Sequence, residues 1–186
     1  PVIGLQHSED GALLIGYGGD SRAQLTAWDA TTLELVQRYP GHAQRVSSLA
    51  VHPKGSALVT SSRDGSVLRW DLWPKASVLR RAAGANGMDL GVSTDGQSVA
   101  SVDAQGVARI WSGEDLELEW EGMLGSRLFC CALTPSHLYA AGEGLFRVDR
   151  ATDEVVPFPA PEGRVASLHV DPKGRWLLGG SHPWGR

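Results

Sequence analysis

The chain repeats itself at a period of about 41 residues. A Trp-Asp pair stands at Trp28-Asp29 and returns at Trp70-Asp71, 42 residues later. Trp111 follows after a further 41 residues, with Ser112 in place of the aspartate. A period near 40 residues is typical of four-stranded units that stack, because one such unit cannot bury its apolar face alone. The period therefore predicts an all-β chain of stacked units that share a core and present a surface to other molecules.

Composition agrees with this reading and excludes several functions. The 186 residues include 23 Gly and 10 Pro and are 42% hydrophobic, which suits many short strands joined by turns. No run approaches the roughly 20 apolar residues that cross a bilayer, so we expect a cytoplasmic protein without membrane association. The net charge of −4 argues against nucleic acid as a partner, since nucleic-acid binders usually carry a basic excess. The chain starts at Pro1 without a leader pattern, which suggests a segment of something longer.

Neither cysteines nor histidines indicate a metal or cofactor site. Cys130 and Cys131 are adjacent, and adjacent residues of a strand point to opposite faces, so a disulfide between them would distort the backbone. Buried free thiols in a reducing compartment are the expectation. The six histidines lack the close spacing of a zinc motif. We expect no metal and no cofactor.

The second repeat is the clearest unit. It opens at Gly41-His42 and continues with an expected inner strand at 46–51. A second strand at 57–62 is rich in β-branched and small residues. The Asp64-Gly65 pair is the strongest short hairpin signal, and a third strand follows at 66–71. A fourth strand is expected after Trp73-Pro74.

These anchor points resemble the WD-repeat (WD40-type) family. Gly41-His42, Asp64-Gly65 and Trp70-Asp71 match the three positions that mark a repeat of that family. The resemblance implies an all-β propeller of four-stranded antiparallel blades, of which about four and a half lie in this chain, as part of a seven- or eight-bladed ring. It also implies a structural tetrad, a hydrogen-bonded chain that ties the strands of one blade together without catalytic function. Its members here would be His42, Thr60 or Ser62, Asp64 and Trp70.

The blades become less regular along the chain. Ala83 and Gln105 replace the tetrad histidine and aspartate in the third, and Val148-Asp149 replaces Trp-Asp in the fourth. The fifth begins at Arg164 and contains two strands, and we expect its remaining strands to come from further polypeptide or a second chain. The expected blades are 1–40, 41–81, 82–122, 123–161 and a partial blade at 162–186.

One position at the start of the inner strands is a candidate partner-binding site. Counting eight residues back from the turns at Pro53, Thr94, Pro135 and Pro172 gives Arg45, Asn86, Arg127 and Arg164. In the WD-repeat family this edge belongs to the face on which partners dock. The arginines could form an arc that binds carboxylates or phosphates. Alternatively, each arginine pairs with an acid of its own or the next blade.

The predicted function is a non-catalytic scaffold that binds a protein or peptide, as a region of a larger multidomain protein or assembly. The sequence contains no glycine-rich phosphate loop and no nucleophile elbow, so we expect no enzyme. The alternative is a propeller with a small-molecule-sensing or enzymatic site in its central channel. A third hypothesis is a structural fragment that completes an assembly.

Overall fold

The computed structural model describes an all-β chain in two compact units, residues 1–87 and 88–186, and each is presented by itself. The described residues form eighteen strands and no helix. They therefore contain no helix that is long and apolar enough to cross a membrane. Consecutive strands of a sheet run antiparallel wherever their register is defined. The described residues are 2–18, 24–55, 57–72, 78–82, 86–159, 164–171 and 175–182.

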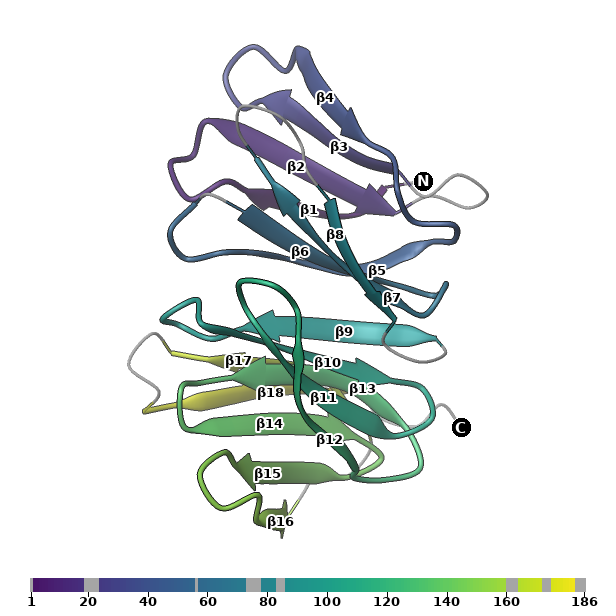
Figure 1. The fold of residues 1–186 in the computed structure, drawn as a ribbon, viewed down its shortest axis with the longest axis vertical. Coiled ribbons are helices and arrows are strands. Elements are labelled where there is room, and N and C mark those ends of the chain that lie inside the picture. Colours follow the sequence, from purple (N-terminus) through teal and green to yellow (C-terminus); the bar gives the residue numbers. More distant parts are fainter. Residues whose placement is uncertain are drawn as a thin grey trace. The chain divides into compact units, whose positions relative to one another are not determined.

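The first unit contains two four-stranded sheets, each with its strands in sequence order (Figure 1). Short connections join neighbouring strands, as expected for blades. The first sheet consists of β1 (Val2–His7), β2 (Leu13–Gly18), β3 (Gln24–Asp29) and β4 (Leu35–Tyr39). The second consists of β5 (Val46–Val51), β6 (Ala57–Ser62), β7 (Ser66–Asp71) and β8 (Val78–Ala82).

The second unit contains two more four-stranded sheets and a two-stranded sheet (Figure 1). One consists of β9 (Gly87–Val92), β10 (Ser98–Asp103), β11 (Val107–Ser112) and β12 (Leu118–Met123). The next consists of β13 (Leu128–Leu133), β14 (His137–Gly142), β15 (Leu145–Asp149) and β16 (Val155–Phe158). The last consists of β17 (Arg164–Val170) and β18 (Leu177–His182).

This architecture confirms the expected fold class of four-stranded antiparallel blades. We number the sheets in chain order as blades one to five, with β17 and β18 forming blade five. The exact blade boundaries and the number of blades in a complete ring stay predictions.

The core of the first unit lies between its two sheets. Leu13 and Ile15 of β2 are buried, whereas Leu14 between them is half-buried, because successive side chains of a strand point to opposite faces. They belong to one apolar cluster with Leu58 and Trp70 of blade two, which are no more than 1% exposed.

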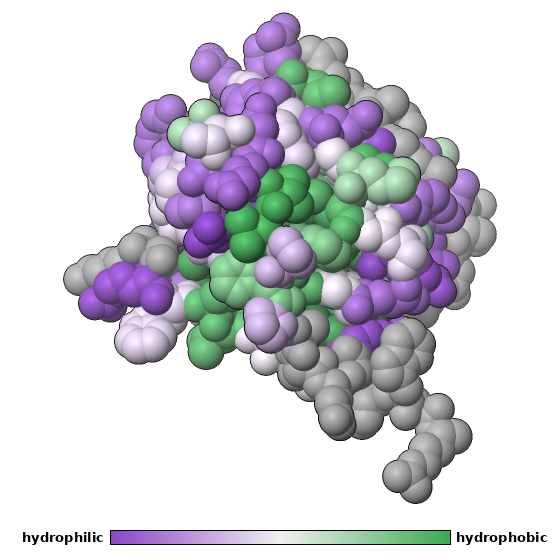
Figure 2. All heavy atoms as spheres, turned by 90° about the horizontal axis from the view of Figure 1, so that it is seen from below, coloured by the Kyte–Doolittle hydropathy of each residue, from purple (hydrophilic) through white to green (hydrophobic). Residues whose placement is uncertain are grey.

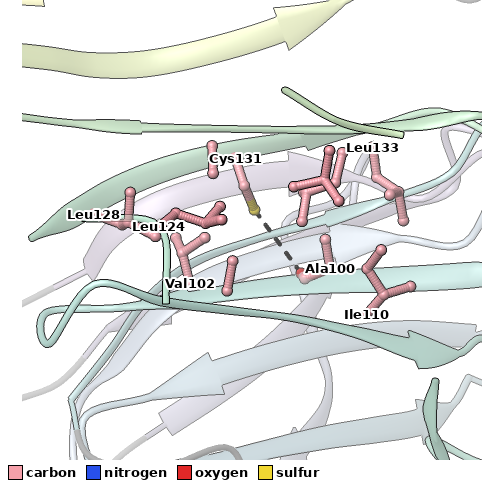
Figure 3. Close-up of a cluster of buried hydrophobic side chains, with 11 residues drawn as sticks. Ala100, Val102, Ile110, Leu124, Leu128, Cys131 and Leu133 are labelled. Atoms are coloured by element: carbon pink, nitrogen blue, oxygen red, sulfur yellow. Dashed lines mark hydrogen bonds between the residues drawn. The ribbon is translucent and has the colours of Figure 1, made fainter. Parts of the chain in front are cut away.

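The second unit has two buried clusters, one on each face of blade four. Figure 3 shows Cys131 in the cluster between blades three and four, with its thiol directed at the carbonyl oxygen of Ala100 at 3.9 Å. Cys130 lies in the other cluster, beside Val165 and Leu168 of blade five. Both thiols are buried and free, and the alternation along β13 places them on opposite faces.

A bulge recurs near the start of the inner strand, by which we mean the first strand of a blade. The register shifts between Val46 and Ser48 in β5, between Leu128 and Cys130 in β13, and between Val165 and Ser167 in β17. The extra residues are Ser47, Phe129 and Ala166. A bulge leaves one residue out of the ladder and turns its side chain aside. The three bulge residues therefore lie at the edge of the sheets where the inner strands begin.

The second unit also exposes apolar side chains. Trp176 and Leu178 are 68% and 67% exposed, and within the described chain β18 pairs only with β17. Phe158 of β16 is 40% exposed. Figure 2 views this unit from the side on which β15 and β16 lie, and apolar side chains gather near the middle of that view.

Candidate partner-binding site

The four candidate residues stand just before or at the start of inner strands, and the three arginines lie two positions ahead of a bulge residue. Arg45 precedes β5, Asn86 precedes β9, Arg127 precedes β13, and Arg164 is the first residue of β17. Asn86, Arg127 and Arg164 are exposed, and Arg45 is half-buried. Within the part of the chain that the structure describes, none of the three arginines lies within ion-pair distance of a carboxylate.

In the second unit, two of these arginines meet at one aromatic ring. The guanidinium carbon of Arg127 lies 5.6 Å from the ring centroid of Phe129. That of Arg164, from the next blade, lies 5.1 Å from the same centroid. Both distances are within the range of a cation–π contact. We call Arg127, Phe129 and Arg164 the Arg–Phe–Arg cluster.

Phe129 was not among the predicted site residues. It is half-buried and occupies the bulge of β13. The sequence contained one usable signal, since Phe129 follows a candidate arginine by two positions, as Ser47 and Ala166 do. Because bulges depend on the pairing of two strands, a single strand's sequence did not reveal it.

In the first unit, Arg45 and Asn86 show different backbone environments. The carbonyl oxygen of Arg45 accepts a hydrogen bond from the amide of Arg63 at 3.0 Å, beside the β6–β7 hairpin. Asn86 has a φ of 54°, a left-handed conformation that asparagine tolerates better than most residues. Asn86 is thus suited to a turn into β9.

The predicted tetrad residues of blade two lie in one hydrogen-bonded chain. The indole N–H of Trp70 donates to the Thr60 hydroxyl at 2.9 Å, and that hydroxyl lies 2.7 Å from Nε2 of His42. Nδ1 of His42 lies 2.9 Å from the Ser66 hydroxyl, which donates to Oδ1 of Asp64 at 2.5 Å. Ser66 is thus a link that the sequence reasoning missed.

Ser62, the alternative to Thr60, lies outside this chain. Its hydroxyl donates to the carbonyl oxygen of Gln44 at 3.0 Å and accepts from the amide of Asp64 at 3.1 Å. Thr60 and Ser62 therefore have separate tasks: Thr60 joins Trp70 to His42, and Ser62 fixes the hairpin.

Asp64 is held in its charged form. Burial acts to raise the pKa of Asp64. Its carboxylate accepts hydrogen bonds from the Ser66 hydroxyl and from the amides of Ala43 and Ser66, and it lies near His42. These interactions outweigh burial and lower the pKa below its usual value. The side chains of His42 and Asp64 are only 1% and 4% exposed. Groups so thoroughly enclosed and hydrogen-bonded offer no surface to a substrate.

Blade three keeps part of this arrangement with different residues. The indole of Trp111 donates to the Ser101 hydroxyl at 2.9 Å, as Trp70 does to Thr60. Gln105 is exposed, and Asp103 binds the hairpin amides of Gln105 and Val107 instead, at 2.9 and 3.0 Å. The other oxygen of Asp103 pairs with Arg109 at 2.9 Å. The expected counterpart of His42, Ala83, lies outside the described residues.

A serine, a histidine and an aspartate meet in blade four. The Ser136 hydroxyl lies 2.9 Å from Nδ1 of His137, and Nε2 of His137 lies 3.5 Å from Asp149. Asp149 also accepts the amides of Ala151 and Thr152, which makes it a turn residue. An open pocket of about 380 Å³ lies beside them. Ser136 is exposed, and His137 is the half-buried first residue of β14, so this contact joins sequence neighbours where the chain enters that strand.

No group of three metal-binding side chains occurs within the described ranges. Arg150, which lines the pocket, donates to the carbonyl oxygen of Pro135 at 3.0 Å and to the Ser98 hydroxyl at 2.7 Å. Arg150 therefore joins blades three and four. The partner-binding role expected of Arg127 and Arg164 in the Arg–Phe–Arg cluster stays a prediction.

Residues 33–71 match the family model described as WD domain, G-beta repeat. This segment contains the Trp70-Asp71 pair and the residues of the hydrogen-bonded chain. The match confirms the resemblance to the WD-repeat family.

Curated proteins match longer parts of the chain. The small ribosomal subunit protein RACK1y of Oryza sativa is 30% identical over 125 residues, 64% of this chain and 36% of that protein. The anaphase-promoting complex subunit cdh1 of Dictyostelium discoideum is 36% identical over 73 residues, 39% of this chain and 10% of that protein. The protein ROOT INITIATION DEFECTIVE 3 of Arabidopsis thaliana is 33% identical over 72 residues, 39% of this chain and 16% of that protein. The matched segments span little more than a third of these relatives at most.

Proposed function

We propose that the chain is a non-catalytic scaffold that binds a protein or peptide, as a region of a larger multidomain protein or assembly. The observation that carries this proposal is the set of four-stranded blades, with residues 33–71 matching the WD-repeat model. Two of the relatives carry the name of an assembly: one is named as a subunit of an anaphase-promoting complex, and the other as a protein of the small ribosomal subunit. A protein can serve in such an assembly with a binding surface alone.

The partner-binding surface is the edge at which the inner strands begin. Arg45, Asn86, Arg127 and Arg164 occupy equivalent positions there. Asn86, Arg127 and Arg164 are exposed, and no arginine of the set has an acid partner among the described residues. Both observations support this surface over the alternative of internal ion pairing. Arginine is suited to such a role because its planar guanidinium binds carboxylates with two parallel hydrogen bonds.

The tetrad residues have a structural role in this proposal. His42, Thr60, Asp64 and Trp70 satisfy one another inside blade two, and a fully satisfied buried polar network favours one arrangement of its strands. Their enclosure supports a scaffold over an enzyme.

Further strands complete blade five, supplied by additional polypeptide or by a second chain. The support is the free edge of β18 among the described residues, together with the exposed Trp176 and Leu178. An unpaired strand edge presents amide and carbonyl groups that readily accept another strand. We place the protein in the cytoplasm, where the free thiols of Cys130 and Cys131 would stay reduced.

The test is affinity capture of partners with the intact protein and with a variant combining Arg45→Ala, Arg127→Ala and Arg164→Ala. A matched control combines Arg38→Ala, Arg63→Ala and Arg175→Ala, which removes the same charge from other exposed arginines. We expect the control to retain a specific partner that the first variant loses. Equal recovery by both would contradict the proposed surface, and the absence of any specific partner of the intact protein would contradict the scaffold itself.

The alternative function, a small molecule or substrate in a central channel, predicts a different result. A metabolite panel would then raise the melting temperature of the protein, because a ligand that binds only the folded state stabilises it. Under the scaffold proposal we expect no shift with metabolites.

A further inference from the structure

We propose that the Arg–Phe–Arg cluster docks an acidic peptide segment through two separate carboxylates, one on Arg127 and one on Arg164. This inference rests on the proposed scaffold function and specifies the chemistry of its partner.

The fold brings the three side chains together from two blades. Arg127 immediately precedes β13, Phe129 lies in the bulge of that strand, and Arg164 begins β17, which packs beside β13. The bulge turns the Phe129 side chain out of the regular ladder. The ring can therefore receive a cation from its own blade and another from the next, at 5.6 and 5.1 Å.

The cluster holds two positive charges that the described chain does not neutralise. The aromatic ring attracts each guanidinium through its quadrupole but carries no net charge. Glu143 lies next to Arg127 through the backbone, since its amide donates to the Arg127 carbonyl oxygen at 3.3 Å. Its carboxylate instead accepts the hydroxyl of Ser126. A bound anion would relieve the repulsion between the two arginines.

Two monovalent cations that come from separate blades match two monovalent anions better than one divalent group. Each guanidinium can bind one carboxylate through two parallel hydrogen bonds. Glutamates or aspartates at alternate positions of an extended peptide lie on one side of it, since side chains in extended chains alternate. The partly exposed Phe129 ring offers an apolar contact between them. We therefore favour a carboxylate pair over a phosphorylated residue.

The protein's own charge limits non-specific attraction of such peptides. The net charge is −4, so an acidic segment is repelled by the protein as a whole. Binding would then depend on the local charge of the cluster and weaken with added salt.

The test is fluorescence anisotropy with three labelled peptides of one length: one containing Glu-Gly-Glu, one containing Gln-Gly-Gln, and one with a single phosphoserine. Each is titrated with the intact protein and with Arg127→Gln, Arg164→Gln and the matched control Arg63→Gln. We expect the Glu-Gly-Glu peptide to bind the intact protein and the control, and each cluster variant to raise its Kd by about tenfold, which corresponds to about 1.4 kcal/mol. A double Arg127→Lys, Arg164→Lys variant keeps the charge but loses the planar guanidinium, and we expect intermediate binding.

The outcomes separate this inference from the proposed function. Binding of the phosphoserine peptide but not of Glu-Gly-Glu would overturn the carboxylate assignment. If Arg127→Gln and Arg164→Gln bind Glu-Gly-Glu as well as the intact protein does, the cluster is not its site. If no peptide binds but the intact protein captures a partner that both variants also retain, the inference fails and the scaffold function stands. Melting temperatures show whether each variant is folded.

Discussion

At the scale of single residues, Thr60 has the most demanding position in blade two. It is fully buried, and its one hydroxyl connects the indole of Trp70 with the imidazole of His42. The hydroxyl can accept from Trp70 while it donates its one proton to His42. Ser101 meets Trp111 in the same way in blade three. The hydroxyl is therefore the feature required at this position.

Thr60→Val is predicted to destabilise the protein although it makes the site more apolar. It leaves the Trp70 N–H and His42 Nε2 buried without their partner, which costs about 1–3 kcal/mol. Thr60→Ser is the matched control, because it keeps the hydroxyl and loses only a methyl group. Urea denaturation should give a lower midpoint for Thr60→Val than for Thr60→Ser. The reverse order would mean that methyl packing matters more than the hydroxyl.

The charge of Asp64 predicts a pH dependence of stability. Its folded pKa lies below the ordinary value of 3.8, so the carboxylate favours the folded state. That contribution is present above pH 3.8 and is lost as the pH falls through the lower, folded value. Asp64→Asn should lower the unfolding free energy at pH 7 and lose less stability than the intact protein during acidification. Denaturant midpoints measured from pH 7 to pH 2.5 test this, and parallel pH profiles would contradict it.

The two cysteines are predicted to be unreactive in the folded protein. Burial, with the nearby charge of Asp89, raises the pKa of Cys130 to about 12 and that of Cys131 well above its usual value. The thiolate is the reactive form, so a thiol reagent at pH 8 should modify neither residue until denaturant is added. Rapid modification without denaturant would show that β13 opens readily.

At the scale of elements, the turn between the third and fourth strands explains why an aspartate closes the third strand. In blade one, Asp29 accepts the amides of Thr31 and Thr32 at 2.8 Å each. Asp149 binds two amides of the corresponding turn in blade four. The aspartate thus remains useful in blade four although Val148 has replaced the tryptophan.

The same turn contains a residue in left-handed conformation. The φ angles of Leu33 and Leu116 are 59° and 56°, and this region costs a residue with a Cβ about 1–2 kcal/mol. Leu33 is 65% exposed, whereas Leu116 is fully buried. Leu33→Asn should therefore raise the unfolding free energy by about 0.5–1 kcal/mol, because asparagine tolerates the conformation.

Leu116→Asn is the matched control for that prediction. It relieves the same backbone strain but removes a buried apolar side chain, so a loss of about 2–5 kcal/mol should dominate. Thermal denaturation followed by circular dichroism compares the two. A loss of stability in Leu33→Asn would show that the exposed leucine makes a contact worth more than the strain.

Sequence patterns predicted the strands and hairpins of the blades better than the bulges and the replaced side-chain contacts. The period, the Asp64-Gly65 hairpin and the Trp-Asp pairs indicated four-stranded blades because they report local turn chemistry and alternation. The bulge at Phe129 depends on two paired strands, and the role of Asp103 depends on its distance from Arg109, so neither was visible in a linear pattern. The candidate arginines were located by counting, but their partner chemistry stays a prediction.

At the scale of the whole molecule, stacking leaves some sheet faces covered and others bare. In the first unit, Ile15 and Leu25 of blade one are buried against blade two, while Val2 and Leu5 of β1 are 58% and 59% exposed. In the second unit, blade four has a buried cluster on each face, whereas Leu178 of blade five is 67% exposed. Exposed apolar side chains on sheets are candidates for contact with further protein.

Self-association of the isolated 186-residue chain is therefore predicted to increase with concentration. Among the residues that the structure describes, β18 pairs only with β17, so its other edge can accept another strand. Burial of Leu5 and Leu178 would contribute about 25 cal/mol for each Å² of apolar surface removed from water. Light scattering after size-exclusion chromatography should show species larger than a monomer, and Leu5→Lys with Leu178→Lys should shift the population toward monomer. A charged side chain opposes association at an exposed edge without disturbing a buried core. A compact monomer at every concentration, unchanged by these substitutions, would contradict completion of blade five by a second copy of this chain.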